Sequence, residues 1–275
     1  MIQGIIEMMS YPFMTRAFLV GSLVALCSAL LGVSLVLKRY SMIGDGLSHV
    51  GFGAMAIAAA MNAAPLAVAI PIVIVAAVLL LRINSNAKIK GDAAIALIST
   101  SSLAIGVMVI SLTTGMNTDV YNYMFGSILA MSSDDLKLSV ILSVIVLILF
   151  IFFYHKIFAI TFDETFARAT GVKAGLYNML IAVLTAVTIV LGMRMMGALL
   201  ISSLIIFPAL TSMRVFKSFK GVVWSSGILS VICFCIGMTA SYLCSTPAGA
   251  SVVLVNLAAF LLFTLFTIIR KNGRR

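Results

Sequence analysis

The chain has 275 residues, of which 63% are hydrophobic and only 9% are charged, and its formal net charge is +10. A water-soluble globular protein carries roughly a quarter charged residues, so this composition excludes a soluble domain and predicts a protein surrounded by lipid. Nucleic acid is not an expected partner, because the basic residues stand singly or in small groups between apolar runs, as membrane-flanking charges do.

Nine apolar runs approach the length of about twenty residues that a membrane-spanning helix needs. In chain order they are Thr15–Leu37, Met42–Asn62, Pro65–Leu81, Ala93–Leu112, Leu136–Tyr154, Leu176–Leu191, Ala198–Met213, Val222–Tyr242 and Ala248–Ile269. The second and seventh runs are the least regular and could be broken or re-entrant, so eight spans is the alternative. Helices satisfy their own backbone hydrogen bonds in lipid. We therefore expect an all-α, polytopic membrane protein of eight or nine helices, with residues 1–275 forming a single transmembrane domain.

The distribution of charge predicts the orientation of these spans. If nine spans alternate, fifteen of the eighteen Lys and Arg residues fall on one side of the membrane: Lys38, Arg39, Arg82, Lys88, Lys90, Lys156, Arg168, Lys173, Arg214, Lys217, Lys220, Arg270, Lys271, Arg274 and Arg275. The other side carries Glu7, Asp119, Asp134 and Asp135. By the positive-inside rule the basic side is cytoplasmic, which predicts an outside N-terminus and a cytoplasmic C-terminus.

Two ionisable residues lie inside the second apolar run, in the sequence GDGLSH (residues 44–49). Asp45 and His49 are four residues apart and so share one face of a helix. If Arg39 marks the inner interface and the chain is helical from there, they lie about 9 and 15 Å deep, and His49 approaches the midplane of the membrane. A charged Asp at membrane depth costs on the order of 2.5–3.5 kcal/mol, so such residues usually face a cavity and a partner. A divalent cation is a suitable partner, and two copies of the pair in a homodimer would supply two oxygens and two nitrogens, which suits Zn²⁺ and can also hold Mn²⁺ or Fe²⁺.

A structural role for this pair is the alternative. Asp45 could cap a helix that restarts after a break, with His49 hydrogen-bonded to a neighbouring helix. Four glycines, Gly44, Gly46, Gly51 and Gly53, surround the pair. They allow either close helix packing, which is the favoured interpretation, or a thin wall along a path.

The longest polar connection on the basic side, residues 155–175, reads HKIFAITFDETFARATGVKAG. Thr161 and Glu164 have capping-box spacing, which predicts a helix capped by Thr161, and Gly171 is placed to end it. Phe162, Phe166 and Ala169 give this helix an apolar side, and reversal of the Arg168 charge with Glu164 intact is expected to weaken docking to a partner. The pattern fits either a helix that docks in a groove of a partner or one that lies on the inner leaflet.

Several segments resemble the permeases of bacterial ABC importers for zinc, manganese and iron. They are KRYSMIGDGLSHVGFGAMA (38–56), KGDAAIALISTSSLAIGVMVIS (90–111), YMFGSILAMSSDDL (123–136), FDETFARATGV (162–172), MGALLISSLIIFPALTSMRV (196–215) and TPAGASVVLV (246–255). The resemblance implies that two permease copies pair and that Asp45 and His49 coordinate the metal in the translocation path. It also implies that residues 155–175 are the coupling segment, that a cytoplasmic ATPase drives transport, and that an extracytoplasmic metal-binding protein delivers the ion. Many members follow the histidine with a proline-containing stretch, whereas this chain has VGFGAM.

Together these observations predict a multi-pass protein of the bacterial plasma membrane that contacts lipid and works as the permease of an ATP-driven importer for a divalent transition metal. Zinc is favoured, then manganese or iron, as the transported substrate, and no permanently bound cofactor is expected. The chain has no G-x-x-x-x-G-K-[ST] loop, so it is not expected to be an enzyme, and ATP hydrolysis would belong to a separate subunit. The alternative is a secondary carrier or channel that uses Asp45 and His49 as a proton or ion relay without an ATPase.

Overall fold

The computed structural model describes residues 7–86, 91–113 and 132–272, and no strand occurs among them. The helices are α2 (Pro12–Leu37), α3 (Ile43–Ala60), α4 (Pro65–Asn86), α5 (Gly91–Thr113), α7 (Ser133–Phe152), α8 (Tyr154–Phe162), α9 (Glu164–Ala169), α10 (Ala174–Met196), α11 (Ala198–Val215), α12 (Phe219–Cys244) and α13 (Ala248–Asn272). Five of the charged residues that predict the orientation of the spans lie outside the described residues: Lys88, Lys90, Asp119, Arg274 and Arg275.

All nine predicted apolar runs are helical, which confirms the all-α, polytopic fold. Eight of the described helices are long and apolar enough to cross a membrane. The remaining predicted run corresponds to a shorter apolar stretch, Leu200–Val215 within α11. The two runs that were expected to be least regular form the unbroken helices α3 and α11. Pro208 lies inside α11 without ending it.

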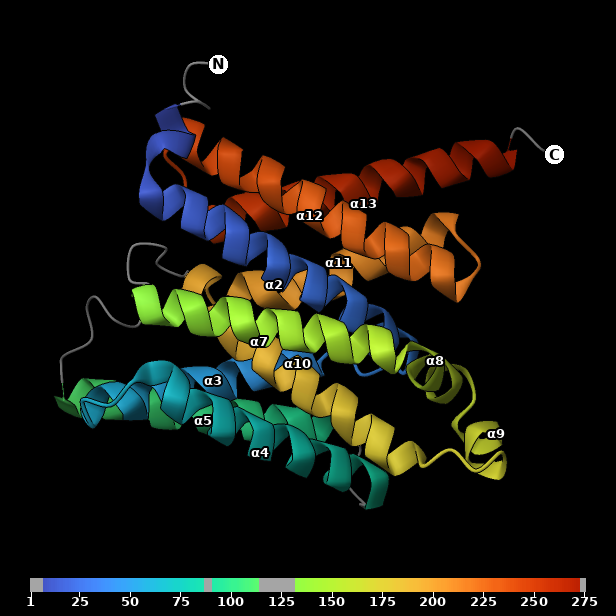
Figure 1. Cartoon of the computed structure of the whole chain (residues 1–275), viewed down its shortest axis with the longest axis horizontal. Helices are drawn as coiled ribbons and strands as arrows, with labels where there is room; N and C mark the ends of the chain where they lie inside the picture. The colour runs from blue at the N-terminus through green and yellow to red at the C-terminus, as the bar shows by residue number, and fades with distance from the viewer. Residues whose placement is uncertain (1–6, 87–90, 114–131, 273–275) are drawn as a thin grey trace.

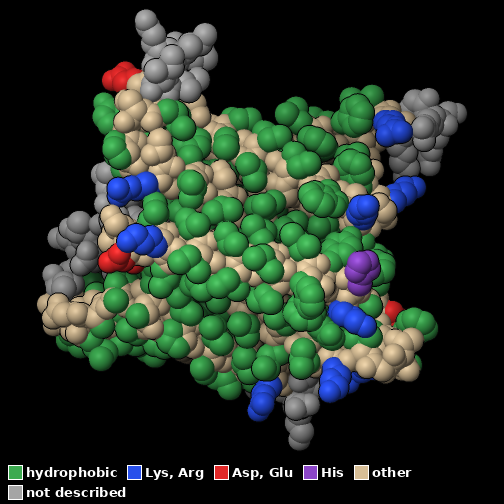
Figure 2. Space-filling view, viewed as in Figure 1, with side chains coloured by type: hydrophobic (Ala, Val, Ile, Leu, Met, Phe, Trp, Pro, Cys, Tyr) green, Lys and Arg blue, Asp and Glu red, His purple; other side chains and the backbone are tan. Residues whose placement is uncertain are grey.

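The long helices run roughly along one direction, with α2 between α7 and α12 (Figure 1). Lys38, at the end of α2, contacts Ile160 and Glu164, so these residues share one end of the bundle, which we call the basic end. At the opposite end Arg194 pairs with Asp135, their side-chain nitrogen and oxygen atoms 3.8 Å apart. An apolar band lies between these ends, and charged side chains gather toward them (Figure 2). This is the surface that a membrane-spanning bundle needs.

The turn between α2 and α3 has a fixed geometry. The amide of Tyr40 donates to the carbonyl of Leu35 at 2.8 Å, and the amide of Arg39 donates to the carbonyl of Val36 at 3.1 Å. The backbone of Arg39 has the left-handed conformation, with φ 61°. This is the Schellman pattern that ends many helices. Because it occupies residues 38–40, α3 starts only at Ile43.

Candidate metal site and coupling surface

The structure brings Asp45 and His49 together on one face of α3, as the sequence predicted. The Nε2 atom of His49 lies 3.7 Å from the Oδ2 atom of Asp45, and their side chains are 25% and 48% exposed. Asp45 is in the first turn of α3, where the positive end of the helix dipole favours a carboxylate. The pair is therefore accessible from outside the chain rather than closed in by neighbouring helices.

Glycines pack the other faces of α3 against its neighbours. A Cβ atom added at Gly53 would lie 2.7 Å from the carbonyl oxygen of Ser102 in α5, and one at Gly51 would lie 2.5 Å from the Cε atom of Met193 in α10. One at Gly46 would lie 2.7 Å from Ile95. These contacts confirm close helix packing as the role of the glycines, and they leave the stripe that carries Asp45 and His49 uncovered.

The start of α3 at Ile43 agrees with the predicted run, which begins at Met42. The depths of 9 and 15 Å were counted from Arg39 as if the chain were helical from there, but residues 38–40 form the Schellman turn. The helical rise from Ile43 to His49 is about 9 Å at 1.5 Å per residue.

The structural alternative for Asp45 is wrong in one respect. Met42 occupies the N-cap position of α3, and Asp45 is already inside the helix. The backbone carbonyl of Asp45 accepts a hydrogen bond from the Ser48 hydroxyl at 2.7 Å, and the Asp45 carboxylate faces His49. Within the described part of the chain, no group of three or more His, Cys, Asp or Glu side chains is placed to hold a metal ion. A single chain thus presents two side chains of metal-binding type at this position.

The predicted coupling segment contains two helices, α8 and α9, instead of one. Thr161 is not an N-cap, because α8 continues through it and its hydroxyl donates to the carbonyl of Ile157 at 2.6 Å. The chain leaves the helical conformation at Asp163, whose φ is −147° and ψ 95°, and the Asp163 carboxylate caps α9 by accepting from the amide of Phe166 at 2.9 Å. The predicted end is confirmed, since Gly171 has φ 83° just after α9 and its amide donates to Arg168.

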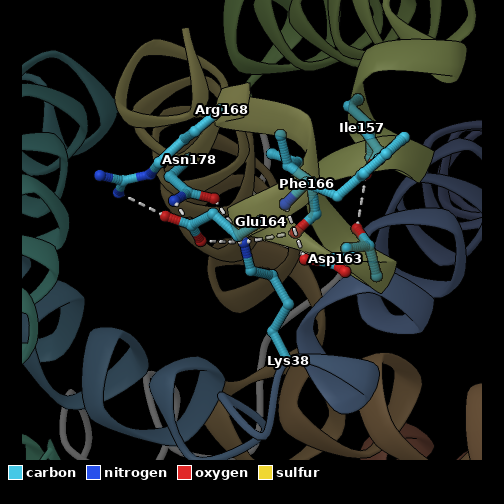
Figure 3. Close-up of polar contacts among 9 residues, drawn as sticks. Lys38, Ile157, Asp163, Glu164, Phe166, Arg168 and Asn178 are labelled. Carbon is cyan, nitrogen blue, oxygen red and sulfur yellow. Dashed lines mark hydrogen bonds and ion pairs between the residues drawn. The ribbon is translucent and has the colours of Figure 1, made fainter. Parts of the chain in front are cut away.

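Because Asp163 caps α9, the Glu164 carboxylate takes no part in the predicted capping box. It instead joins α9 to two other helices (Figure 3). It accepts from Lys38 at 3.2 Å, Asn178 at 3.0 Å and Arg168 at 2.6 Å. The Lys38 ammonium also donates to the Asn178 side-chain oxygen at 2.5 Å and to the Ile160 carbonyl at 3.1 Å. This cluster of Lys38, Glu164, Arg168 and Asn178, here called the α9 anchor, connects the ends of α2 and α10 to α9.

Burial and charge together set the protonation of the α9 anchor. Burial alone would raise the pKa of Glu164, but hydrogen bonds from Asn178, Arg168 and Lys38 outweigh it and lower the pKa to about 2. Burial lowers the pKa of Lys38, and Glu164 opposes that shift. Lys38 and Asn178 were not predicted as functional residues, because a basic residue after an apolar run does not reveal which distant carboxylate it meets.

The predicted apolar side of the coupling segment is open at the surface. Phe162 and Phe166 are 60% and 65% exposed, whereas Ala167 is buried on the side that faces the bundle. Arg168 is exposed beside them and holds Glu164 at 2.6 Å. The α9 anchor therefore holds this segment against the bundle, and the rings of Phe162 and Phe166 lie exposed on the surface.

The chain is similar to known membrane transport proteins along most of its length. A family model described as the ABC 3 transport family matches residues 10–267. The chain is 30% identical to the high-affinity zinc uptake system membrane protein ZnuB of Haemophilus influenzae, with 92% of this chain and 97% of that protein aligned. It is 27% identical to the manganese transport system membrane protein MntC of Listeria monocytogenes, with 97% and 94% aligned. PsaBC from Streptococcus pneumoniae in complex with Fab is a similar solved structure, with a TM-score of 0.86, 28% identity and coverage of 96% and 95%.

Proposed function

The chain belongs to the ABC 3 transport family and is a membrane permease of that family, and on this premise we propose that it passes a divalent transition-metal ion between two copies of Asp45 and His49. The observation that carries the proposal is the open stripe of α3, where a carboxylate and an imidazole lie 3.7 Å apart and accessible. Both are metal-ligand types, and the ion would neutralise the carboxylate within the membrane.

A second copy of the chain completes this site. One copy offers a single oxygen donor group and a single nitrogen donor group, which is too few to hold an ion in a protein cage. Two copies facing each other across α3 offer two of each, the four-ligand set that zinc takes in tetrahedral geometry. The helix stripe is accessible to such a copy because α4, α5, α10 and α11 pack on the remaining faces of α3.

The nitrogen content of this donor set favours zinc over manganese and iron. The names of two relatives, one a zinc uptake protein and one a manganese transport protein, support a transition-metal ion as the substrate without deciding between these metals. The ion is cargo, bound in passing, and the chain itself makes and breaks no covalent bond.

The outward rings of Phe162 and Phe166 supply the surface on which a cytoplasmic ATPase would dock. An apolar side on a short helix that is held firmly to the bundle is suited to transmit force from a partner's groove. The basic end of the bundle would then face the cytoplasm, in agreement with the positive-inside rule. An extracytoplasmic metal-binding protein would deliver the ion to the opposite end.

Metal analysis of the purified full-length protein tests this proposal. With zinc or manganese chloride as the added probe, we expect about one ion per two chains, lost in Asp45→Asn and in His49→Gln. Asp134→Asn is the matched control, because this carboxylate is almost fully exposed at the start of α7. Equal metal content in all four proteins would overturn the metal site. Proton-driven metal uptake by the chain alone, without an ATPase, would instead support the secondary carrier.

A further inference from the structure

A groove opens on the surface between α7 and α12. Both helices pack on α2 but hardly touch each other, so α2 forms the floor of the space between them. The groove has a volume of about 710 Å³, and fourteen residues of α2, α7, α8 and α12 line it, among them Leu26 and Leu30 on the floor. None of the described residues that line it belongs to α3, the helix through which two copies would pair.

The walls of the groove are apolar and exposed. Ile151 on α7 and Ile228 on α12 are more than half exposed. The face of the molecule seen in Figure 2 carries an apolar band between its charged ends. The protein itself does not cover these apolar side chains. Contact with hydrocarbon chains is favourable for them, because it removes their apolar surface from water.

One end of the groove has a different chemistry. Lys220, His155 and Tyr154 line it there, at the basic end of the bundle, and Trp224 lies one helical turn from Lys220. Trp224 is the only tryptophan in the chain. Trp and Tyr gather at the level of lipid headgroups, so this end marks the membrane interface independently of the charges. Among the described residues that line the groove none is Asp or Glu, so its polar end is suited to an anion.

The length of the groove restricts what can fill it. From Lys220 to Ile232 the rise along α12 is about 18 Å at 1.5 Å per residue, and Ile232 is near the middle of α12. A partner helix would need a surface along the full hydrocarbon thickness of about 30 Å, whereas one leaflet is about half of that. The groove therefore has the dimension of one phospholipid molecule standing in one leaflet.

From these observations we propose that the α7–α12 groove is a binding site for an anionic phospholipid of the leaflet at the basic end. Its acyl chains lie along Leu26, Leu30 and Ile228, and its phosphate accepts hydrogen bonds from Lys220 and His155. Basic pockets between membrane helices bind anionic headgroups in this way. The bound lipid would fill the space beside α8, the first helix of the predicted coupling segment.

Because Trp224 is the only tryptophan, its fluorescence reports occupancy of the groove. The purified full-length protein is reconstituted in mixtures of brominated phosphatidylglycerol and unbrominated phosphatidylcholine, and in the reverse pairing, and quenching gives the relative affinity of the two lipids. We expect about a fivefold preference for phosphatidylglycerol, the effect of one lysine at the membrane surface. Lys220→Gln should bring the ratio close to one.

Lys217→Gln is the matched control, since it removes the same charge three residues away, from an exposed lysine that does not line the groove. It should keep the preference of the wild type. Equal quenching by the two lipids in the wild type, or the same preference in Lys220→Gln as in Lys217→Gln, would overturn the site. Both lysines are exposed, so neither change should disturb folding, and neither outcome depends on metal transport.

Discussion

Lys38 and Glu164 are 126 residues apart in the chain, yet the Lys38 ammonium lies 3.2 Å from the Glu164 carboxylate, and the lysine side chain is only 9% exposed. This contact joins the end of α2 to α9. Because the Schellman turn at Arg39 leads directly from Lys38 to α3, the same residue also connects the coupling segment with the helix that carries Asp45 and His49. Only residues 39–42 separate the α9 anchor from the helix that carries the candidate metal site.

The first prediction concerns the stability of the α9 anchor. Glu164→Gln leaves the Lys38 charge buried without a carboxylate, and removal of one partner of a buried pair costs about 3–5 kcal/mol. Since Glu164 is 33% exposed, we expect the lower end of that range. Arg168→Gln is the control, because its pair with Glu164 is at the surface and is worth about 0–1 kcal/mol. Thermal unfolding of the purified protein measures both, and an equal loss in the two variants would contradict this assignment.

The second prediction concerns acid. The pKa of Glu164 is lowered to about 2 from its ordinary value of 4.5, so its contribution to stability is complete above pH 4.5 and is lost as the pH falls toward 2. The melting temperature of the wild type should fall more steeply across this interval than that of Glu164→Gln, which has no carboxylate to protonate. Parallel pH profiles of the two proteins would show that the carboxylate is not held by its three donors.

The third prediction concerns the packing behind the candidate metal site. At Gly53 even a methyl group would lie 2.7 Å from a backbone oxygen of α5, which cannot rotate away. Gly53→Ala should therefore separate α3 from α5 and cost about 1–3 kcal/mol. Gly175→Ala, where an added Cβ meets nothing within 4 Å, is the control and should be neutral or slightly stabilising. If the Gly53→Ala protein were as stable as the wild type in thermal unfolding, α3 and α5 could move apart without a loss of stability, which would contradict this prediction.

The fourth prediction concerns the coupling surface. Phe166→Ala removes an exposed ring without touching the α9 anchor, so the permease should stay folded while its ATPase copurifies less, by about tenfold in affinity if the ring is a central contact. Arg168→Glu, with Glu164 intact, should weaken the same association through the reversed charge. Leu138→Ala, an exposed apolar residue near the start of α7, is the control. Unchanged recovery of the ATPase with Phe166→Ala would argue for a helix that only lies on the membrane.

Local features of the site were predictable where a few neighbouring residues decide them. The four-residue spacing of Asp45 and His49 places them on one face of any helix, and Gly171 ends α9 because a left-handed residue there suits glycine. The N-cap was not predictable from spacing. Thr161 and Asp163 are both cap-forming residue types, and the choice between them depends on how far α8 extends, which its packing through the buried residues Ile157 and Ile160 decides.

The sequence by itself determined the approximate bounds and the apolar character of the membrane helices, because hydropathy and length belong to contiguous residues and lipid requires a helix of each long apolar run. It also determined that a carboxylate and an imidazole share a face of α3. Only the tertiary structure decided that this face stays open while Gly46, Gly51 and Gly53 pack the others, and that Lys38 finds Glu164 and Asn178. Those outcomes depend on which helices meet, and contacts between residues on different helices leave no periodic signal in the chain.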